Sequence, residues 1–249
     1  MCILFVAIDA HPDYPLIVCA NRDEFHHRAT EPAYRWPTIP TIYAGQDKLA
    51  GGTWLGVNEL GQFAGLTNIR EIAQQDGVRS RGELVVNALC TTEITPQWLS
   101  EHAINYNPFN LVFQQQQKLY CFNSKTLQTT LLSPGFHAVS NGALDDIWPK
   151  MAKGQQALQS YITQTDQPEV EALRTLMLDT SQPADVDLPQ TGLSVEWERR
   201  LSSIFIQHEE YGTRSTSIVL KHRSGNMTFC ETRYDGKARN LGSQLFTLD

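Results

Sequence analysis

The chain begins with two short apolar runs joined by a polar, proline-rich link, and the second run leads into four consecutive polar residues. Residues 2–8 and 16–20 are the apolar runs, 9–15 is the link, and the tetrad Asn-Arg-Asp-Glu occupies 21–24. Apolar runs of this length around a Pro-containing turn predict a hairpin of buried strands. The tetrad is then expected where the second strand ends, beside the start of the first strand.

Cys2 directly follows the initiator Met. A residue this small allows Met1 to be removed, which would place a thiol and a free α-amino group on one residue. The two groups titrate near ~8.5 and ~7.7–8.0, so the amine can serve as base for its own side chain in acyl transfer. The alternative is that Cys2 is a small apolar residue opening a buried strand.

Further along the chain the patterns predict more strands, with helices between them. Residues 25–50 are rich in Pro and Thr and predict a long ordered loop, and 51–57 with 62–68 predict a second hairpin. The predicted helices cover 82–90, 96–103, 146–163 and 168–178. The predicted later strands cover 109–115, 118–123, 127–132, 136–140, 201–207, 214–221 and 226–232. This order favours an α+β fold with antiparallel pairing.

Composition and cysteine spacing exclude several classes of protein. The 249 residues carry a net charge of −7, which argues against nonspecific binding to nucleic acid or anionic membranes. The five scattered cysteines lack zinc-finger or haem-attachment spacing and indicate reduced thiols, so we expect a cytoplasmic protein without a metal ion. The opening apolar run is too short for a secretory signal or a membrane span. A local basic pocket remains possible, with candidates Arg22, Arg70, Arg79, Arg81 and Arg214.

Four polar residues are candidates for chemistry, and each has a structural alternative. Asp23 can hold an α-ammonium group at residue 2, or cap a turn. Arg22 offers a planar donor fork for a carboxylate or oxyanion, or pairs with Glu24. Asn141 is a candidate oxyanion donor or part of an Asn-Gly turn, and Arg214 either reaches the same end of the sheet or is solvated.

The sequence resembles a bacterial member of the NRDE-motif family of transport and Golgi organisation 2 proteins. The resemblance extends along nearly the whole chain through these motifs: Met1-Cys2-Ile3, Ala20-Asn21-Arg22-Asp23-Glu24-Phe25, Gly51-Gly52-Thr53-Trp54-Leu55-Gly56, Leu66-Thr67-Asn68, Arg81-Gly82-Glu83-Leu84-Val85, Phe109-Asn110-Leu111, Ser140-Asn141, Trp148-Pro149-Lys150 and Tyr211-Gly212-Thr213-Arg214.

The resemblance implies one domain over 1–249 with an N-terminal nucleophile hydrolase-like fold, a four-layer αββα sandwich of two antiparallel sheets. It also invites comparison with the penicillin V acylase and bile-salt hydrolase group. Cys2 falls on the nucleophile of that group, Asp23 on its amine-binding Asp, and Asn141 on its oxyanion Asn. Those enzymes have an Arg three residues before the Asp, where this chain has Ala20.

The family is linked to haem mobilisation and to lipid or acyl-CoA metabolism, so the resemblance implies a haem-binding and haem-trafficking protein, with haem as cargo and haem-acceptor proteins as partners. The expected ligand-binding residues are Asn21, Arg22, Asp23, Glu24, Trp54, Asn68 and Arg214. One alternative is an N-terminal cysteine amidohydrolase or thioesterase for acyl-amide or acyl-CoA-type substrates, with Cys2, Asp23 and Asn141 as catalytic residues. Another is a non-catalytic interaction scaffold.

Overall fold

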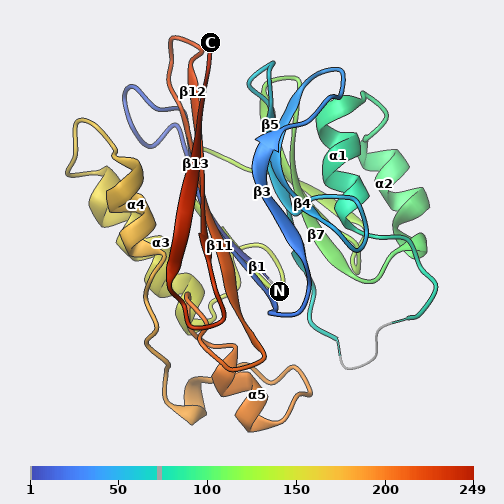
Figure 1. Cartoon of the computed structure of the whole chain (residues 1–249), viewed down its shortest axis with the longest axis vertical. Coiled ribbons are helices and arrows are strands. Elements are labelled where there is room, and N and C mark those ends of the chain that lie inside the picture. The colour runs from blue at the N-terminus through green and yellow to red at the C-terminus, as the bar shows by residue number, and fades with distance from the viewer. Residues whose placement is uncertain (1, 72–74) are drawn as a thin grey trace.

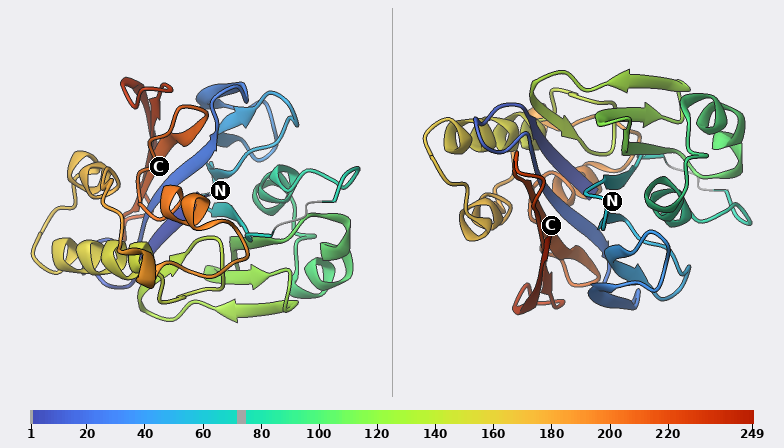
Figure 2. Two further views of the ribbon diagram at one scale, coloured as in Figure 1. Left: turned by 90° about the horizontal axis from the view of Figure 1, so that it is seen from below. Right: turned by 90° about the horizontal axis from the view of Figure 1, so that it is seen from above.

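Two antiparallel sheets pack face to face and form the centre of the molecule. The computed structural model describes residues 2–71 and 75–249. Figure 1 shows α3 and α4 on one side of the paired sheets, with α1 and α2 on the other. The end-on views of Figure 2 show the same succession of layers. The predicted α+β sandwich of two antiparallel sheets is therefore confirmed.

The first sheet contains six strands in the order β10-β1-β2-β11-β12-β13. Every neighbouring pair is antiparallel. The predicted N-terminal hairpin, β1 and β2, lies at the middle of this sheet. The strands are β1 (Cys2–Ile8), β2 (Leu16–Phe25), β10 (Gly135–Val139), β11 (Tyr211–Lys221), β12 (Met227–Tyr234) and β13 (Asn240–Leu248).

The second sheet contains seven strands in sequence order from β3 to β9, again all antiparallel. Gln116 and Gln117 have positive φ at the turn that joins β7 and β8 in a hairpin. The strands are β3 (Thr30–Arg35), β4 (Ile42–Asp47), β5 (Leu55–Asn58), β6 (Phe63–Asn68), β7 (Phe109–Gln115), β8 (Lys118–Asn123) and β9 (Gln128–Leu131).

Helices cover the outer faces of both sheets. On the second sheet, α1 contacts β4 to β7; on the first, α3 contacts β1 and β10, and α4 contacts β11. All four predicted helices are present, and α5 is an addition. The helical elements are α1 (Gly82–Cys90), α2 (Pro96–His102), η1 (Ala103–Asn105), α3 (Pro149–Ile162), α4 (Val170–Leu176), η2 (Asp185–Asp187) and α5 (Val195–Arg200).

Strand alternation divides the apolar residues among three buried layers. Leu4 and Val18 face the core between the sheets, whereas Ile3 and Ile17 face the core beneath α3 and α4. A third core lies between the second sheet and α1 and α2. Polar residues that continue β1 or β2 are therefore buried between the sheets or beneath the helices.

Three predictions about local structure were wrong. The predicted loop 25–50 contains β3 and β4, and the predicted strand 201–207 forms no strand. The tetrad 21–24 does not follow the second strand but lies within it, because β2 continues to Phe25 and pairs with β11 along its whole length. Its four side chains therefore have orientations fixed by the sheet.

Candidate functional site

A pocket of about 520 Å³ lies at the end of the sandwich where β1 begins. Both sheets contribute to it, together with the connection between β4 and β5 and the segment before α1. Six of the predicted site residues line it: Cys2, Arg22, Asp23, Glu24, Trp54 and Asn68. The prediction that the tetrad and Cys2 lie in one place is therefore confirmed for these residues, and three other predicted residues lie elsewhere.

Cys2 is the first residue of β1 and lies opposite Arg22 of β2. Its side chain belongs to the core between the sheets and is 9% exposed. Its carbonyl oxygen accepts a hydrogen bond from Ser140 Oγ at 3.1 Å. Burial raises the pKa of the Cys2 thiol, because the thiolate loses solvation. The protonated thiol is therefore the resting form at neutral pH.

Arg22 is almost completely buried beside the pocket, where its guanidinium meets two carboxylates and an aromatic ring. Its Nη2 lies 3.5 Å from Asp47 Oδ2 and 3.7 Å from Glu24 Oε2. Its Cζ lies 4.5 Å from the centroid of the Trp54 ring, within range of a cation–π interaction. The predicted pairing of Arg22 with a carboxylate is confirmed, and its contact with Glu24 shows that the two side chains lie on one face of the strand.

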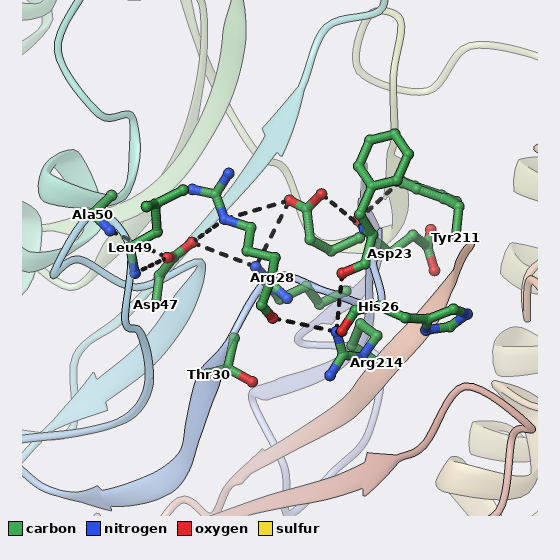
Figure 3. A network of polar contacts seen from close by, with 12 residues as sticks. Asp23, His26, Arg28, Thr30, Asp47, Leu49, Ala50, Tyr211 and Arg214 are labelled. Carbon is green, nitrogen blue, oxygen red and sulfur yellow. Dashed lines mark hydrogen bonds and ion pairs between the residues drawn. The ribbon is translucent and has the colours of Figure 1, made fainter. Parts of the chain in front are cut away.

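Asp47 organises the charged wall of the pocket next to Arg22. Arg28 Nε donates to Asp47 Oδ2 at 2.6 Å, and the backbone N–H groups of Leu49 and Ala50 donate to Asp47 Oδ1. Figure 3 shows this network running from the tetrad strand to the β4–β5 connection. Asp47 thus ties the two sheets together through Arg22 and Arg28.

Asp23 is buried at the same end of the sheet. Thr213 Oγ1 donates to Asp23 Oδ1 at 2.6 Å, and the Tyr211 hydroxyl donates to the Asp23 carbonyl oxygen. Burial raises the pKa of the Asp23 carboxyl, an effect that the positive charges of Lys150 and Arg22 oppose. A hydrogen bond from the residue-2 nitrogen to Asp23 stays a prediction, although both residues line the pocket.

Asn21 does not line the pocket, because strand alternation turns it toward the helices. Its Nδ2 donates to the carbonyl oxygens of Met177 and Ile204 at 2.8 and 2.9 Å. Its Oδ1 accepts from Thr216 Oγ1 at 2.7 Å. These bonds use both amide donors and one acceptor site of the oxygen, so Asn21 binds β2 to the layer of helices and loops that covers this face of the sheet.

Asn141 and Arg214 also lie outside the pocket lining. Asn141 Nδ2 donates to the backbone oxygen of Asn68 at 2.9 Å, so Asn141 lies behind the pocket and Asn68 lines it. Arg214 Nη1 donates to the carbonyl oxygens of Phe25, His26 and Arg28. As Figure 3 shows, Arg214 stabilises the turn that follows β2.

Among the charged lining residues, Arg28, Asp47 and Asp76 were not predicted, and two of the suspected arginines, Arg79 and Arg81, are confirmed in the lining. Asp47 escaped prediction because β4 had no recognisable pattern in the sequence. Burial lowers the pKa of Arg81, which donates to the carbonyl oxygen of Pro108. The pocket therefore carries four arginines around a thiol and an indole ring.

A second buried polar group lies on the helix side of the first sheet. Arg70 forms an ion pair with Glu198 of α5, so this suspected arginine lies outside the pocket lining. Lys150 Nζ, at the start of α3, donates to the carbonyl oxygen of Leu201 at 2.9 Å. Burial lowers the pKa of Lys150 to about 8.

Two antiparallel sheets between helices, with a cysteine opening a central strand at the pocket, define an N-terminal nucleophile hydrolase-like fold. A nematode N-acylethanolamine-hydrolyzing acid amidase ortholog (Caenorhabditis elegans) has a similar structure. Its TM-score is 0.52 at 12% identity, over 88% of this chain and 92% of that one.

The family model described as Transport and Golgi organisation 2 matches residues 1–236. The chain therefore belongs to this family. It is 29% identical to the Transport and Golgi organization 2 homolog of Mus musculus, over 93% of this chain and 92% of the mouse protein. It is 26% identical to Transport and Golgi organization protein 2 of Drosophila melanogaster, over 95% and 93% of the two chains.

The described residues form neither a metal-binding cluster nor a membrane-spanning helix. Across 2–71 and 75–249, His, Cys, Asp and Glu side chains do not gather in groups of three that could hold a metal ion. Within the same residues, every helix is too short or too polar to cross a membrane. The cytoplasmic location stays a prediction.

Proposed function

We propose that the protein binds haem in the pocket beside Cys2 and passes it to acceptor proteins. The observation that carries this proposal is the gathering of a thiol, an indole ring and four arginines around one pocket of about 520 Å³. Haem combines a planar apolar ring with two carboxylates. An aromatic wall suits the ring, and arginines form charge-assisted bonds with carboxylates.

The burial of each side chain indicates which part of haem it would contact. Arg22 is buried, and its Nη1 has no acceptor among the described residues, whereas the side chain of Arg79 is 51% exposed at the rim and pairs with Glu83. We assign one haem carboxylate to Arg22 and the other to Arg79 and Arg81, with Trp54 against the ring. The Cys2 thiol is the group of this lining whose sulfur can ligate iron. An exposed rim also allows release, which a trafficking protein requires.

Haemin titration tests the proposal. The purified protein should give a saturable Soret change at micromolar haemin and should then transfer the haemin to an apo-haem protein. The double variant Arg79→Gln/Arg81→Gln should weaken binding, whereas Arg35→Gln, an exposed arginine outside the pocket, should not. Cys2→Ala should shift the Soret maximum if the thiol ligates iron. No saturable change in the unmodified protein rejects haem binding.

The position of Cys2 favours a second candidate, an N-terminal cysteine amidohydrolase or thioesterase. Cys2 opens a central strand, lines the pocket with Asn68, and lies at the same end as buried Asp23. After removal of Met1, the α-amine would take the thiol proton, the sulfur would attack the acyl carbonyl, and the leaving amine or thiol would take that proton. Water would then hydrolyse the acyl-enzyme.

Mass and turnover measurements separate this candidate from haem binding. A hydrolase should lack Met1 by intact mass, release product from an acyl amide or acyl thioester, and lose turnover in Cys2→Ala with its fold unchanged. Cys90→Ala, which changes a half-buried thiol outside the pocket, is the matched control. Retention of Met1 on protein purified from the native host excludes this mechanism.

A further inference from the structure

Buried polar groups of Arg22, Ser215 and Glu231 form one cluster beneath the pocket. Arg22 Nη1 has no hydrogen-bond partner among the described residues, and the Ser215 hydroxyl lies beside the Glu231 carboxyl. Ser215 lies opposite Arg22 across β2 and β11, and Glu231 lies on the next strand, β12, opposite Ser217. A buried donor without a partner is uncommon, so Arg22 Nη1 calls for a functional reason.

The three side chains share the face that looks toward the second sheet. Glu231 Oε1 accepts a hydrogen bond from the backbone N–H of Ala33 in β3 at 2.8 Å, which bridges the sheets. A Cβ atom placed on Gly45 would lie 2.9 Å from Glu231 Oε2 and 2.4 Å from the Trp54 ring. Glu231 is therefore close to the indole whose ring also contacts the Arg22 guanidinium.

The carboxyl group of Glu231 is 1% exposed in a setting with opposing influences. Burial raises the pKa of Glu231 to about 7, while the charges of Arg233 on its own strand and Arg22 on β2 act to lower it. Hydrogen bonding from the Ala33 backbone of β3 and from Ser215 of β11 also acts to lower this pKa, and β4 contributes the neutral Gly45 at this carboxyl. Its protonation therefore depends on how far these two arginines are neutralised.

Arg22 can be neutralised from the pocket side. Its Nη2 already faces Asp47 and Glu24, and its Nη1 has no acceptor among the described residues. An anionic ligand group paired with Arg22 reduces the positive field at Glu231, which favours the protonated carboxyl. The proton that Glu231 takes up comes from solvent, and the protonation requires no other reactant.

We propose that Glu231 is the proton-linked partner of Arg22: when an anion in the pocket, or a substitution, neutralises Arg22, Glu231 takes up a proton. This inference rests on the proposed function only in requiring an anionic ligand. By linkage, a ligand that causes proton uptake binds more tightly as the pH falls and is released as the pH rises. The cluster thus makes ligand retention sensitive to pH near neutrality.

The coupling is measurable without any ligand. In protein labelled with ¹³C at the glutamate carboxyl groups, the signal absent from Glu231→Gln identifies Glu231, and its shift gives the titration midpoint. We expect a midpoint of about 7, raised by about 1 pH unit in Arg22→Gln and unchanged in the surface control Arg35→Gln. An unchanged midpoint in Arg22→Gln overturns the proposal.

Calorimetry with haemin in two buffers of different ionisation enthalpy then measures proton uptake on binding. At pH 7 we expect about half a proton per haemin from this carboxyl. That contribution should be absent in Glu231→Gln and present in Glu209→Gln, an exposed control. Equal uptake in Glu231→Gln overturns the proposal. Failure of haemin to bind, with the Arg22 effect on the midpoint intact, rejects haem as ligand and leaves the coupling supported.

Discussion

At the scale of single residues, strand alternation divides the polar tetrad into two groups with different surroundings. Arg22 and Glu24 face the space between the sheets, and Asn21 faces the helices. The alternation was predictable from the sequence because successive side chains of a strand point to opposite faces. The pairing of Arg22 with Asp47 was not predictable, because Asp47 comes from the other sheet.

The surroundings of Asn21 predict a structural role. Asn21→Ala removes both donors to the Met177 and Ile204 carbonyl oxygens, and leaves these buried acceptors unsatisfied. We expect the free energy of unfolding to fall by about 2–6 kcal/mol, from two groups at about 1–3 kcal/mol each. Urea denaturation measures this change. Asn240→Ala, at an exposed position, should change stability by less than about 1 kcal/mol; an equal loss in both variants would contradict this role.

Glu231 predicts the pH dependence of stability. Its pKa rises from 4.5 in the unfolded chain to about 7 in the folded protein. Between these values the folded protein holds a proton that the unfolded chain releases, so stability falls as the pH rises. We expect a loss of up to about 3 kcal/mol across this window, at 1.36 kcal/mol per pKa unit.

Urea denaturation of the wild type and Glu231→Gln at pH 4.5, 5.5, 6.5 and 7.5 isolates this contribution. The difference in unfolding free energy between the two proteins should change steadily through the window and become constant above it. A difference that stays constant from pH 4.5 to 7.5 would show that Glu231 has an ordinary pKa.

At the scale of elements, the amphipathic helices and most strands were predictable, including the edge strands β9 and β10, whereas β3, β4 and β13 were not. β3 contains Pro32 and has an irregular register with β4, which is typical of an edge strand. β13 lies at the other sheet's edge and is mostly exposed. Segment 201–207 resembled a strand because Leu201, Ile204 and Phe205 are apolar, but they are buried as irregular chain, where Asn21 binds the Ile204 carbonyl.

The packing of α3 on β1 depends on a glycine. A Cβ added at Gly154 would lie 2.0 Å from Cζ of Phe5, a fully buried ring. Gly154→Ala should therefore lower the free energy of unfolding by about 1–3 kcal/mol through overpacking, despite the better helix propensity of Ala. Thermal unfolding measures the effect, with Ser160→Ala on the exposed face of α3 as control. A stabilised Gly154→Ala variant would mean that propensity outweighs the contact.

At the scale of the whole molecule, the resemblance to a known family predicted the four-layer sandwich, whereas the local hydrophobic pattern of the sequence did not. The first sheet takes β1, β2 and β10 from the first 139 residues and β11 to β13 from the last 39. Pairing of β2 with β11 joins residues about 190 positions apart, as in the bond between Thr213 and Asp23. Local periodicity carries no information about such pairing, so the environment of Asp23 could not be derived from the sequence.

Because both sheets line the pocket, a bound ligand should stabilise both of them together. Haemin at about ten times its Kd should slow amide hydrogen exchange about tenfold in 21–24 of the first sheet and in the 48–54 connection of the second. Residues 117–134 at the opposite end, around the Ile8 and Leu16 cavity, should be unchanged. Mass spectrometry measures exchange in each segment, with Arg79→Gln/Arg81→Gln as the weak-binding control. Protection confined to one sheet would place the ligand outside the pocket, because a molecule that fills it contacts strands and loops of both.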